Sequence, residues 1–389
     1  MRQRIAMLDC ARGIAILGIL LMNITAFGLP KAAYLNPAYA GSISITRGEA
    51  WTWAVLDMVA QVKFLTLFAL LFGGGLVLLL PRGTRWIRAR LFWLMGFGLL
   101  HAIFFWDGDI LLDYGLVGLL CLGLIPQAPS DRNVIATGTV LYLLGVVLLL
   151  IFQLLLGSQP PGRFWLPDIA NRVYEHYWQT VGGPEAWRER VNLLHGSLLA
   201  MASQYGWQLA GAMLIGAGLM RNGWLAGRRA PAHYRRMALW LIPTGLIINL
   251  PAVVAQWQLG WDYRWCGFLL QMPREISAPF QALGYVALLY GFWPRLADKT
   301  VIRLLSNVGR MALTNYLLQT LLCTLLFNQL GLFMAYDRLQ LMMFVPAVWL
   351  VNIAVSALWL RHFRQGPMES VWRHLTQLTG GAPQPNASS

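Results

Sequence analysis

The chain has 389 residues, of which 57% are hydrophobic and only 12% are charged. Soluble globular proteins usually contain about 45–50% apolar and about 25% charged residues, so this composition excludes a soluble enzyme, a disordered protein and a nucleic-acid-binding domain. It is typical of an all-α, polytopic integral membrane protein. The formal net charge of +14 agrees with this class, because Lys and Arg accumulate in the cytoplasmic loops of membrane proteins.

The start of the chain resembles a signal peptide, because basic residues precede an apolar run at residues 13–29 and Pro37-Ala38-Tyr39-Ala40 is similar to a cleavage site. The run is long for the apolar region of a signal peptide, and Ala40 lies well beyond its end. We therefore expect an uncleaved first transmembrane helix.

Ten apolar runs are candidate membrane spans, because a helix needs about 20 residues to cross about 30 Å of hydrocarbon. Residues 51–62 could also form an interfacial helix that leads into the second span. The ten runs cover approximately residues 13–29, 58–80, 89–106, 110–126, 134–156, 194–220, 237–257, 276–293, 308–330 and 341–360.

Most Lys and Arg residues fall in cytoplasmic segments if both termini are placed in the cytoplasm, as the positive-inside rule requires. We therefore predict one transmembrane domain over residues 1–389, with about ten helices and both termini inside. A periplasmic cap loop is expected at residues 157–192 and a cytoplasmic tail at residues 361–389. The expected location is the inner membrane of a bacterium, with membrane lipids as neighbours and a homo-oligomer as an open option.

The densest group of ionisable side chains surrounds the expected turn between the third and fourth spans. His101 lies roughly 8 Å inside that turn, and Asp109 and Asp113, four residues apart, are expected to share one face of the fourth helix. Ionisable groups are expensive in lipid, so each is a functional hypothesis. An imidazole beside carboxylates suits a general base, whereas a structural His101–Asp109 pair that locks two helices is an equally good interpretation.

Nearby residues complete this candidate site. His195 stands near the outer start of the sixth span and could reach the same cleft. The candidate catalytic groups are His101, Asp107 and Asp109, and the candidate substrate-binding groups are Trp106, Asp113, Tyr114 and His195.

The first helix contributes a second group. Asp9 and Arg12 are three residues apart and can pair near the cytoplasmic face. Asn23 follows Arg12 by 11 positions, or roughly 16 Å, and is expected near the middle of the membrane. A buried Asn needs hydrogen-bond partners. Bridging of helices is the simpler interpretation of Asn23, and a catalytic role is the alternative.

Arginines gather in the expected cytoplasmic segments, and guanidinium groups suit bidentate phosphate binding. Arg12, Arg82 and Arg85 are candidate ligand-binding residues, although positive-inside anchoring also explains such residues. Gly73, Gly74 and Gly75 could let a slender ligand approach the backbone, although glycines more often let membrane helices pack closely.

No metal site is expected. The four cysteines form no CxxC pair, and neither HxxxH nor HExxH spacing occurs among the six histidines, although these are the spacings that zinc sites commonly use.

Five pieces of sequence, taken in order, resemble the YeiB-like family of bacterial inner-membrane proteins, a domain of unknown function. The resemblance extends along nearly the whole chain. The pieces are Leu8-Asp9-Cys10-Ala11-Arg12-Gly13 with Gly18 to Asn23, Phe68 to Gly73, Gly98 to His101 with Trp106 to Leu111 and Tyr114, Gly309 to Tyr316, and Gly366 to Arg373.

That family is similar, at a distance, to the transmembrane acyltransferases, which include the lysosomal enzyme that acetylates terminal glucosamine of heparan sulfate and the bacterial sugar O-acyltransferases. The resemblance implies a ten-helix core that moves an acyl group, such as acetyl, from cytoplasmic acyl-CoA to a hydroxyl or amine of a sugar, lipid or envelope glycan outside. In the O-acyltransferases a catalytic His stands where Asn23 falls here. The glucosamine acetyltransferase has Asn there and takes its His from the following loop, but this chain has no His between Gly28 and Ala50.

His101, from another helix, is therefore our hypothesis for the base, oriented by Asp109 or Asp107. Asn23 would donate to the developing oxyanion, and the arginines would hold the CoA phosphates while the flexible arm of CoA passes the glycines. No Ser or Cys is placed as a covalent nucleophile, so direct transfer is favoured. Two other functions stay open: a proton-coupled transporter or lipid flippase that uses His101 and its neighbouring acids as a relay, and a non-catalytic scaffold.

Overall fold

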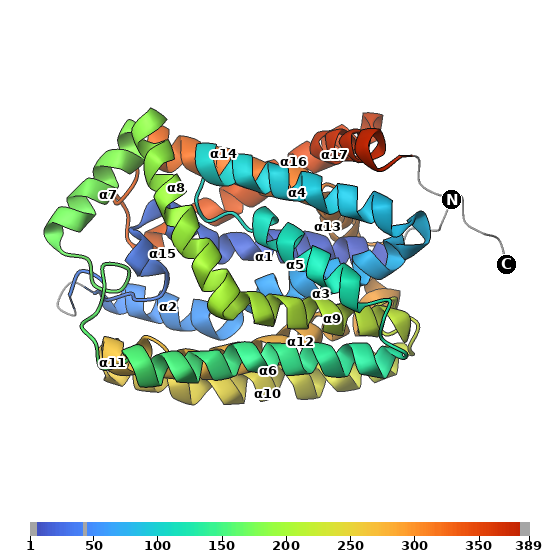
Figure 1. Ribbon diagram of the computed structural model, residues 1–389, viewed down its shortest axis with the longest axis horizontal. Coiled ribbons are helices and arrows are strands. Elements are labelled where there is room, and N and C mark those ends of the chain that lie inside the picture. Colours follow the sequence, from blue (N-terminus) through green and yellow to red (C-terminus); the bar gives the residue numbers. More distant parts are fainter. Residues whose placement is uncertain (1–5, 42–44, 382–389) are drawn as a thin grey trace.

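The computed structural model describes residues 6–41 and 45–381, which form a bundle of helices without any β-strand in those ranges. Figure 1 shows most of the long helices running in roughly the same direction, with α7 at one end of the bundle and α17 near the other. The helices of five residues or more are α1 (Ala6–Gly28), α2 (Arg47–Val59), α3 (Lys63–Leu79), α4 (Thr84–Phe104), α5 (Leu111–Leu124), α6 (Asp131–Leu156), α7 (Ile169–Val181), α8 (Gly183–Ala200), a π-helical turn (Met201–Tyr205), α9 (Gly206–Arg221), α10 (Pro231–Gln258), α12 (Met272–Leu296), α13 (Thr300–Arg310), α14 (Ala312–Thr324), a second π-helical turn (Leu325–Gln329), α16 (Phe344–His362) and α17 (Pro367–Gly380).

The predicted class, an all-α multi-pass membrane protein, is confirmed. Within the described residues, six helical segments are long and apolar enough to cross a membrane, and the bent pair α13–α14 would be a seventh. The predicted number of about ten stays a prediction, because α5 is apolar but has only 14 residues. The six segments are Ala6–Gly28, Arg47–Arg82, Thr84–Phe104, Asp131–Leu156, Pro231–Gln258 and Arg338–His362.

Two predicted spans begin at a helix break. The predicted second span, 58–80, starts where α2 ends and α3 begins, and Val62 at this break has a φ of 67°; α2 corresponds to the separate helix that residues 51–62 could form. The predicted span 308–330 starts where the chain bends by 87° between α13 and α14. At this bend, the Asn315 side chain donates hydrogen bonds to the carbonyl oxygens of Val308 and Met311, at 3.2 and 3.0 Å. Backbone groups freed in a membrane need such partners, so Asn315 stabilises the bend.

Glycines bring two pairs of helices into backbone contact. A Cβ atom at Gly13 would lie 2.0 Å from the carbonyl oxygen of Leu305, so α1 and α13 pack without intervening side chains. Gly73 and Gly216 allow the same closeness between α3 and α9, since a Cβ at Gly73 would lie 1.8 Å from the oxygen of Met213. Small residues at helix contacts are the usual solution in membranes.

The predicted cap and tail both contain helices. Residues 157–192 hold α7 and the first half of α8, and Trp165 and Trp178 are buried there. In the tail, α17 packs along α4, and the Trp372 indole donates a 2.8 Å hydrogen bond to the carbonyl of Arg90. Residues 1–5 of the predicted domain and 382–389 of the predicted tail lie outside the described residues.

Candidate active site

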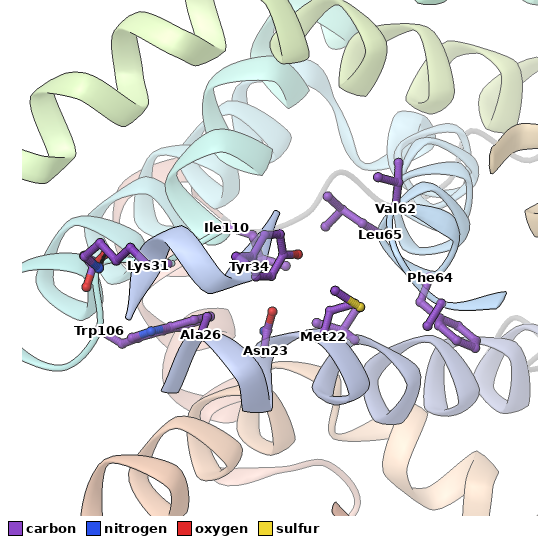
Figure 2. A pocket seen from close by; sticks show the side chains of 14 residues that line it. Met22, Asn23, Ala26, Lys31, Tyr34, Val62, Phe64, Leu65, Trp106 and Ile110 are labelled. Carbon is purple, nitrogen blue, oxygen red and sulfur yellow. Dashed lines mark hydrogen bonds and ion pairs between the residues drawn. The ribbon is translucent and has the colours of Figure 1, made fainter. Parts of the chain in front are cut away.

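A cavity of about 310 Å³ lies beside the C-terminal half of α1. Its walls come from α1, the 3-10 turn Lys31–Tyr34, the α2–α3 break and the loop between α4 and α5. Figure 2 shows the Asn23 side chain pointing from α1 into this space, on the side where Tyr34 lies. Ligand sites in proteins are commonly apolar cavities with a few convergent polar groups. The polar side chains that line this cavity are Asn23, Lys31, Tyr34 and Asp107.

Asn23 is the polar group that α1 presents to the cavity. Its side chain is half-buried and forms no hydrogen bond to any residue in the described ranges. The structure therefore does not show the helix-bridging contact that was the simpler expectation. A half-buried amide without a protein partner has its N–H and oxygen available to a ligand.

Lys31 and Asp107 form an ion pair at the edge of the cavity. The second carboxylate oxygen of Asp107, Oδ1, is buried and has no hydrogen-bond partner among the described residues. The backbone N–H of Lys31 donates to Glu175 of α7 at 2.9 Å. Burial raises the pKa of Glu175, and the nearby Lys31 opposes this rise. Asp107 therefore combines one charge-paired oxygen with one oxygen that can accept a proton or a hydrogen bond.

Lys31 also lines a smaller cavity of about 50 Å³ beneath α7. Its ammonium group lies 5.5 Å from the centre of the Trp178 ring, within the range of a cation–π contact. The same side chain thus separates the cavity beside α1 from the cavity under the cap.

His101 is buried and does not line either of these two cavities. Its Nδ1 lies 2.8 Å from Oδ1 of Asp109, and its Nε2 lies 3.0 Å from the hydroxyl oxygen of Thr320 on α14. The backbone N–H of Leu112 donates to the other Asp109 oxygen at 2.9 Å. Because a carboxylate oxygen accepts, the contact with Asp109 places a proton on Nδ1. The Thr320 hydroxyl lies between Nε2 and the carbonyl oxygen of Tyr316, to which it donates at 3.5 Å. The Trp106 ring packs edge-on against the imidazole and lines the cavity, so His101 lies behind the cavity wall.

The two acids of the fourth span do not share a helix face, in contrast to the expectation. Because α5 begins at Leu111, Asp109 precedes the helix, and its side chain contacts His101. Asp113 instead accepts a 2.9 Å hydrogen bond from Tyr205 in the π-helical turn. Tyr114 donates to the carbonyl of Leu65 at 3.0 Å, and His195 is exposed on α8. Asp113, Tyr114 and His195 line neither cavity.

The predicted donor-binding residues lie at the opposite end of α1. Arg12 pairs with Asp9 at 3.3 Å, as their spacing predicted. Arg82 packs over the Trp86 ring at 5.0 Å, and Arg85 is exposed.

Two of the three predicted glycines lie at close packing contacts. A Cβ at Gly73 would collide with the α9 backbone, and one at Gly74 would lie 2.7 Å from the Leu225 side chain. Gly75 faces the Arg12 guanidinium, 3.6 Å from the position of a Cβ. Close packing, rather than space for a ligand, is therefore the observed role of Gly73 and Gly74.

A cluster of buried charges at the α2–α3 break had no counterpart among the predicted site residues. Asp57 accepts a 2.9 Å hydrogen bond from Arg274 and a 2.8 Å hydrogen bond from Asn249. The Lys63 ammonium donates to the carbonyl of Asp57 at 2.6 Å, and Glu275 lies 3.6 Å from Arg274. The sequence offered one signal for this cluster, a lysine inside an apolar run.

The comparisons with known proteins agree with the motifs. A family described as "Protein of unknown function (DUF418)" matches residues 219–379. The uncharacterized protein YeiB of Escherichia coli strain K12 is 59% identical over 379 residues, which are 97% of this chain and 98% of that protein. The chain belongs to the YeiB-like family. Within it, the uncharacterized protein YxaH of Bacillus subtilis strain 168 is 30% identical over 97% of this chain and 95% of its own length. No solved structure matches this YeiB-like chain significantly.

Proposed function

We propose that this protein is an acyltransferase of the bacterial inner membrane, which moves an acyl group, such as acetyl, from cytoplasmic acyl-CoA to a hydroxyl or amine of a periplasmic sugar, lipid or glycan. The observation that carries the proposal is that three polar residues, Asn23, Lys31 and Asp107, line one cavity, and that the Asp107 carboxylate keeps one buried oxygen without a partner among the described residues. Acyl transfer needs donors for an oxyanion and an acceptor for a proton, and these groups supply both.

In the proposed reaction, the acceptor attacks the thioester carbonyl directly. The Asp107 carboxylate takes the proton from the attacking hydroxyl or amine as the new bond to carbon forms. Asn23 and Lys31 donate to the oxyanion of the tetrahedral intermediate. The carbon–sulfur bond then breaks, and the CoA thiolate takes the proton from Asp107.

In this proposal His101 is not the general base, although the sequence suggested that role. Its two ring nitrogens contact Asp109 and Thr320, so we assign the proton transfer to Asp107, which lines the cavity. His101 acts as a positioning residue, because Asp109 belongs to the loop that carries Asp107 and Trp106.

The test is CoA release by the purified full-length protein in detergent, with acetyl-CoA and a panel of soluble sugars and amines. We expect acceptor-dependent release, reduced about 100-fold in Asn23→Ala and in Asp107→Asn. The matched controls are Asn192→Ala and Asp298→Asn, which change exposed side chains outside both cavities. If the wild type releases no CoA, or if the two cavity variants keep wild-type rates, the proposal fails.

A second function, a proton-coupled transporter of a small molecule or lipid, is favoured by one observation. The charges of Asp57, Lys63 and Arg274 lie buried at the α2–α3 break, and buried charges beside a broken helix are typical of ion-coupled transport sites. This function predicts substrate accumulation in proteoliposomes, driven by a pH gradient and independent of CoA. The acyltransferase proposal predicts CoA release without any gradient.

A further inference from the structure

Arginine and tryptophan side chains stack against one another where α4 meets α17. The Arg90 guanidinium lies 3.3 Å from the centre of the Trp372 ring and 5.6 Å from that of Trp86. Arg82 lies 5.0 Å from the Trp86 ring. The positive-inside rule predicts cationic side chains that extend into water. Exposed Arg85 fits that rule, but the half-buried Arg90 between two indoles does not.

Helix α17 returns from the end of the chain to cover this stack. The Trp372 indole donates to the Arg90 carbonyl at 2.8 Å. Gly380 approaches α4 so closely that a Cβ there would lie 3.1 Å from the Cα of Trp86. Glu369 accepts hydrogen bonds from the backbone N–H groups of Leu313 and Thr314, at 2.8 and 3.1 Å, which fixes the start of α17 against α14. These contacts hold Arg373, the residue after Trp372, beside the stack.

Among the described residues, arginines outnumber carboxylates around Arg90. Arg373, Arg82 and Arg12 all repel the Arg90 guanidinium, and Glu369 attracts it. Within the described ranges, the carboxylates of Asp9 and Glu369 are already engaged, because Asp9 pairs with Arg12 and Glu369 caps α14. Four guanidinium groups gathered around two engaged carboxylates form a favourable place for a multivalent anion.

We propose that Arg90 and Arg373, together with Arg12 and Arg82, bind a phosphate-bearing ligand, and that α17 forms one wall of this site. The inference rests on the proposed function in one respect: the phosphates of acyl-CoA are the expected ligand. The same chemistry would also hold the headgroup of an anionic lipid, so the two sources need separate arms of one experiment.

The position of the arginine cluster fits a donor site. Arg12 and Asn23 belong to the same unbroken helix, α1, and their separation of 11 residues corresponds to roughly 16 Å along its axis. A ligand whose phosphates lie at Arg12 therefore needs an arm of about this length to place a thioester at Asn23. Acyl-CoA carries its thioester at the end of such an extended chain, whereas inorganic phosphate and pyrophosphate have no arm. In this proposal the arginine cluster binds the phosphates, and the cavity beside Asn23 binds the acyl group.

The test uses the full-length protein in detergent and measures binding by the shift of the unfolding temperature. The ligands are CoA, pyrophosphate, and mixed micelles that contain either phosphatidylglycerol or phosphatidylcholine. Arg373→Gln is the main variant, because this side chain is exposed and its loss leaves the packing intact. Arg90→Lys keeps the charge but removes the planar group that stacks on Trp372. Arg361→Gln, an equal change of charge at an exposed site on α16, is the control.

We expect CoA to bind about 10-fold more weakly to Arg373→Gln and Arg90→Lys than to the wild type or Arg361→Gln, and pyrophosphate to compete. If phosphatidylglycerol stabilises the wild type but CoA does not, and if this effect is lost in the same two variants, the phosphate belongs to a lipid headgroup. The site is then confirmed, but acyl-CoA is not its ligand. The inference is overturned if neither ligand binds the wild type, or if both bind Arg373→Gln as tightly as they bind the wild type. Acyl transfer with unchanged CoA affinity in Arg373→Gln would leave the proposed function standing without this site.

Discussion

The hydroxyl oxygen of Thr320 lies 3.0 Å from Nε2 of His101, on the edge of the ring opposite Asp109. Asp109, His101 and Thr320 thus form a continuous chain of hydrogen bonds from the α4–α5 loop to α14. The chain resembles a catalytic triad in its distances, but all three side chains are buried and line neither cavity. The arrangement therefore joins two distant parts of the sequence and fixes the loop that carries Asp107.

The role of this hydrogen-bond chain can be tested with two threonines one helical turn apart. Thr320→Val removes the partner of His101, and we expect the free energy of unfolding to fall by about 1–2 kcal/mol. Thr324→Val is the matched control, since the Thr324 hydroxyl is buried without a partner in the described part of the chain; its replacement should be neutral or stabilising. Unfolding by SDS titration in mixed micelles gives both values. Equal effects of the two substitutions would mean that the contact with His101 contributes nothing.

Lys31 offers a test of the cavity itself. Lys31→Met removes the ion pair with Asp107 and one of the two proposed oxyanion donors, so we expect kcat for acyl transfer to fall about 10- to 100-fold. The affinity for CoA should stay the same, because the arginine cluster is at the other end of α1. The assay is CoA release at saturating acetyl-CoA. Lys299→Met, at an exposed position, provides the control, and a Lys31→Met enzyme with wild-type kcat would remove Lys31 from the reaction.

The buried charges at the α2–α3 break allow a prediction on stability. Lys63→Met leaves the carbonyl of Asp57 without its ammonium donor and leaves Arg274 as the partner of two carboxylates. Removing one member of a buried ionic group costs about 3–5 kcal/mol, so we expect a loss of that size in the free energy of unfolding. Lys299→Met should change it by less than about 0.5 kcal/mol. If Lys63→Met is as stable as the wild type, the ammonium group does not stabilise the chain between α2 and α3.

Composition alone predicted the fold class, because long apolar runs with few charges are typical of helices that lie in lipid. The two helix breaks could not be located in this way. Gln61 and Lys63 flank Val62, and Arg310 precedes Met311, but a charged residue in an apolar run does not by itself mark a break, since Arg90 lies inside the unbroken helix α4. What fixes these breaks is the supply of side-chain donors, and Lys63 and Asn315 are identified as such donors only once the helices are packed.

The candidate site was predictable where its residues are neighbours in sequence. The turn after His101 indicated the pair with Asp109, and the spacing of Asp9 and Arg12 indicated theirs. Contacts between distant segments gave no such signal. Asp113 accepts a hydrogen bond from Tyr205 in the π-helical turn, and Asp107 pairs with Lys31, 76 residues earlier. A pairing of this kind depends on which helices pack together, and no local pattern encodes that.

A substitution at Gly73 distinguishes the two roles considered for this residue: space for the arm of CoA, or close packing of α3 against α9. If it provides space for the arm of CoA, Gly73→Ala should weaken CoA binding and leave stability unchanged. The structure instead places its Cα against the α9 backbone, where a Cβ would meet the Met213 oxygen at 1.8 Å. Since backbone atoms cannot turn aside as a side chain does, α3 and α9 must separate, and we expect a loss of about 2 kcal/mol or more in the free energy of unfolding. Gly196→Ala is the control, because a Cβ there meets nothing within 4 Å, and helix propensity should make it stabilising by up to about 1 kcal/mol. SDS-induced unfolding of the two variants, with CoA binding measured on the same samples, decides between packing and passage.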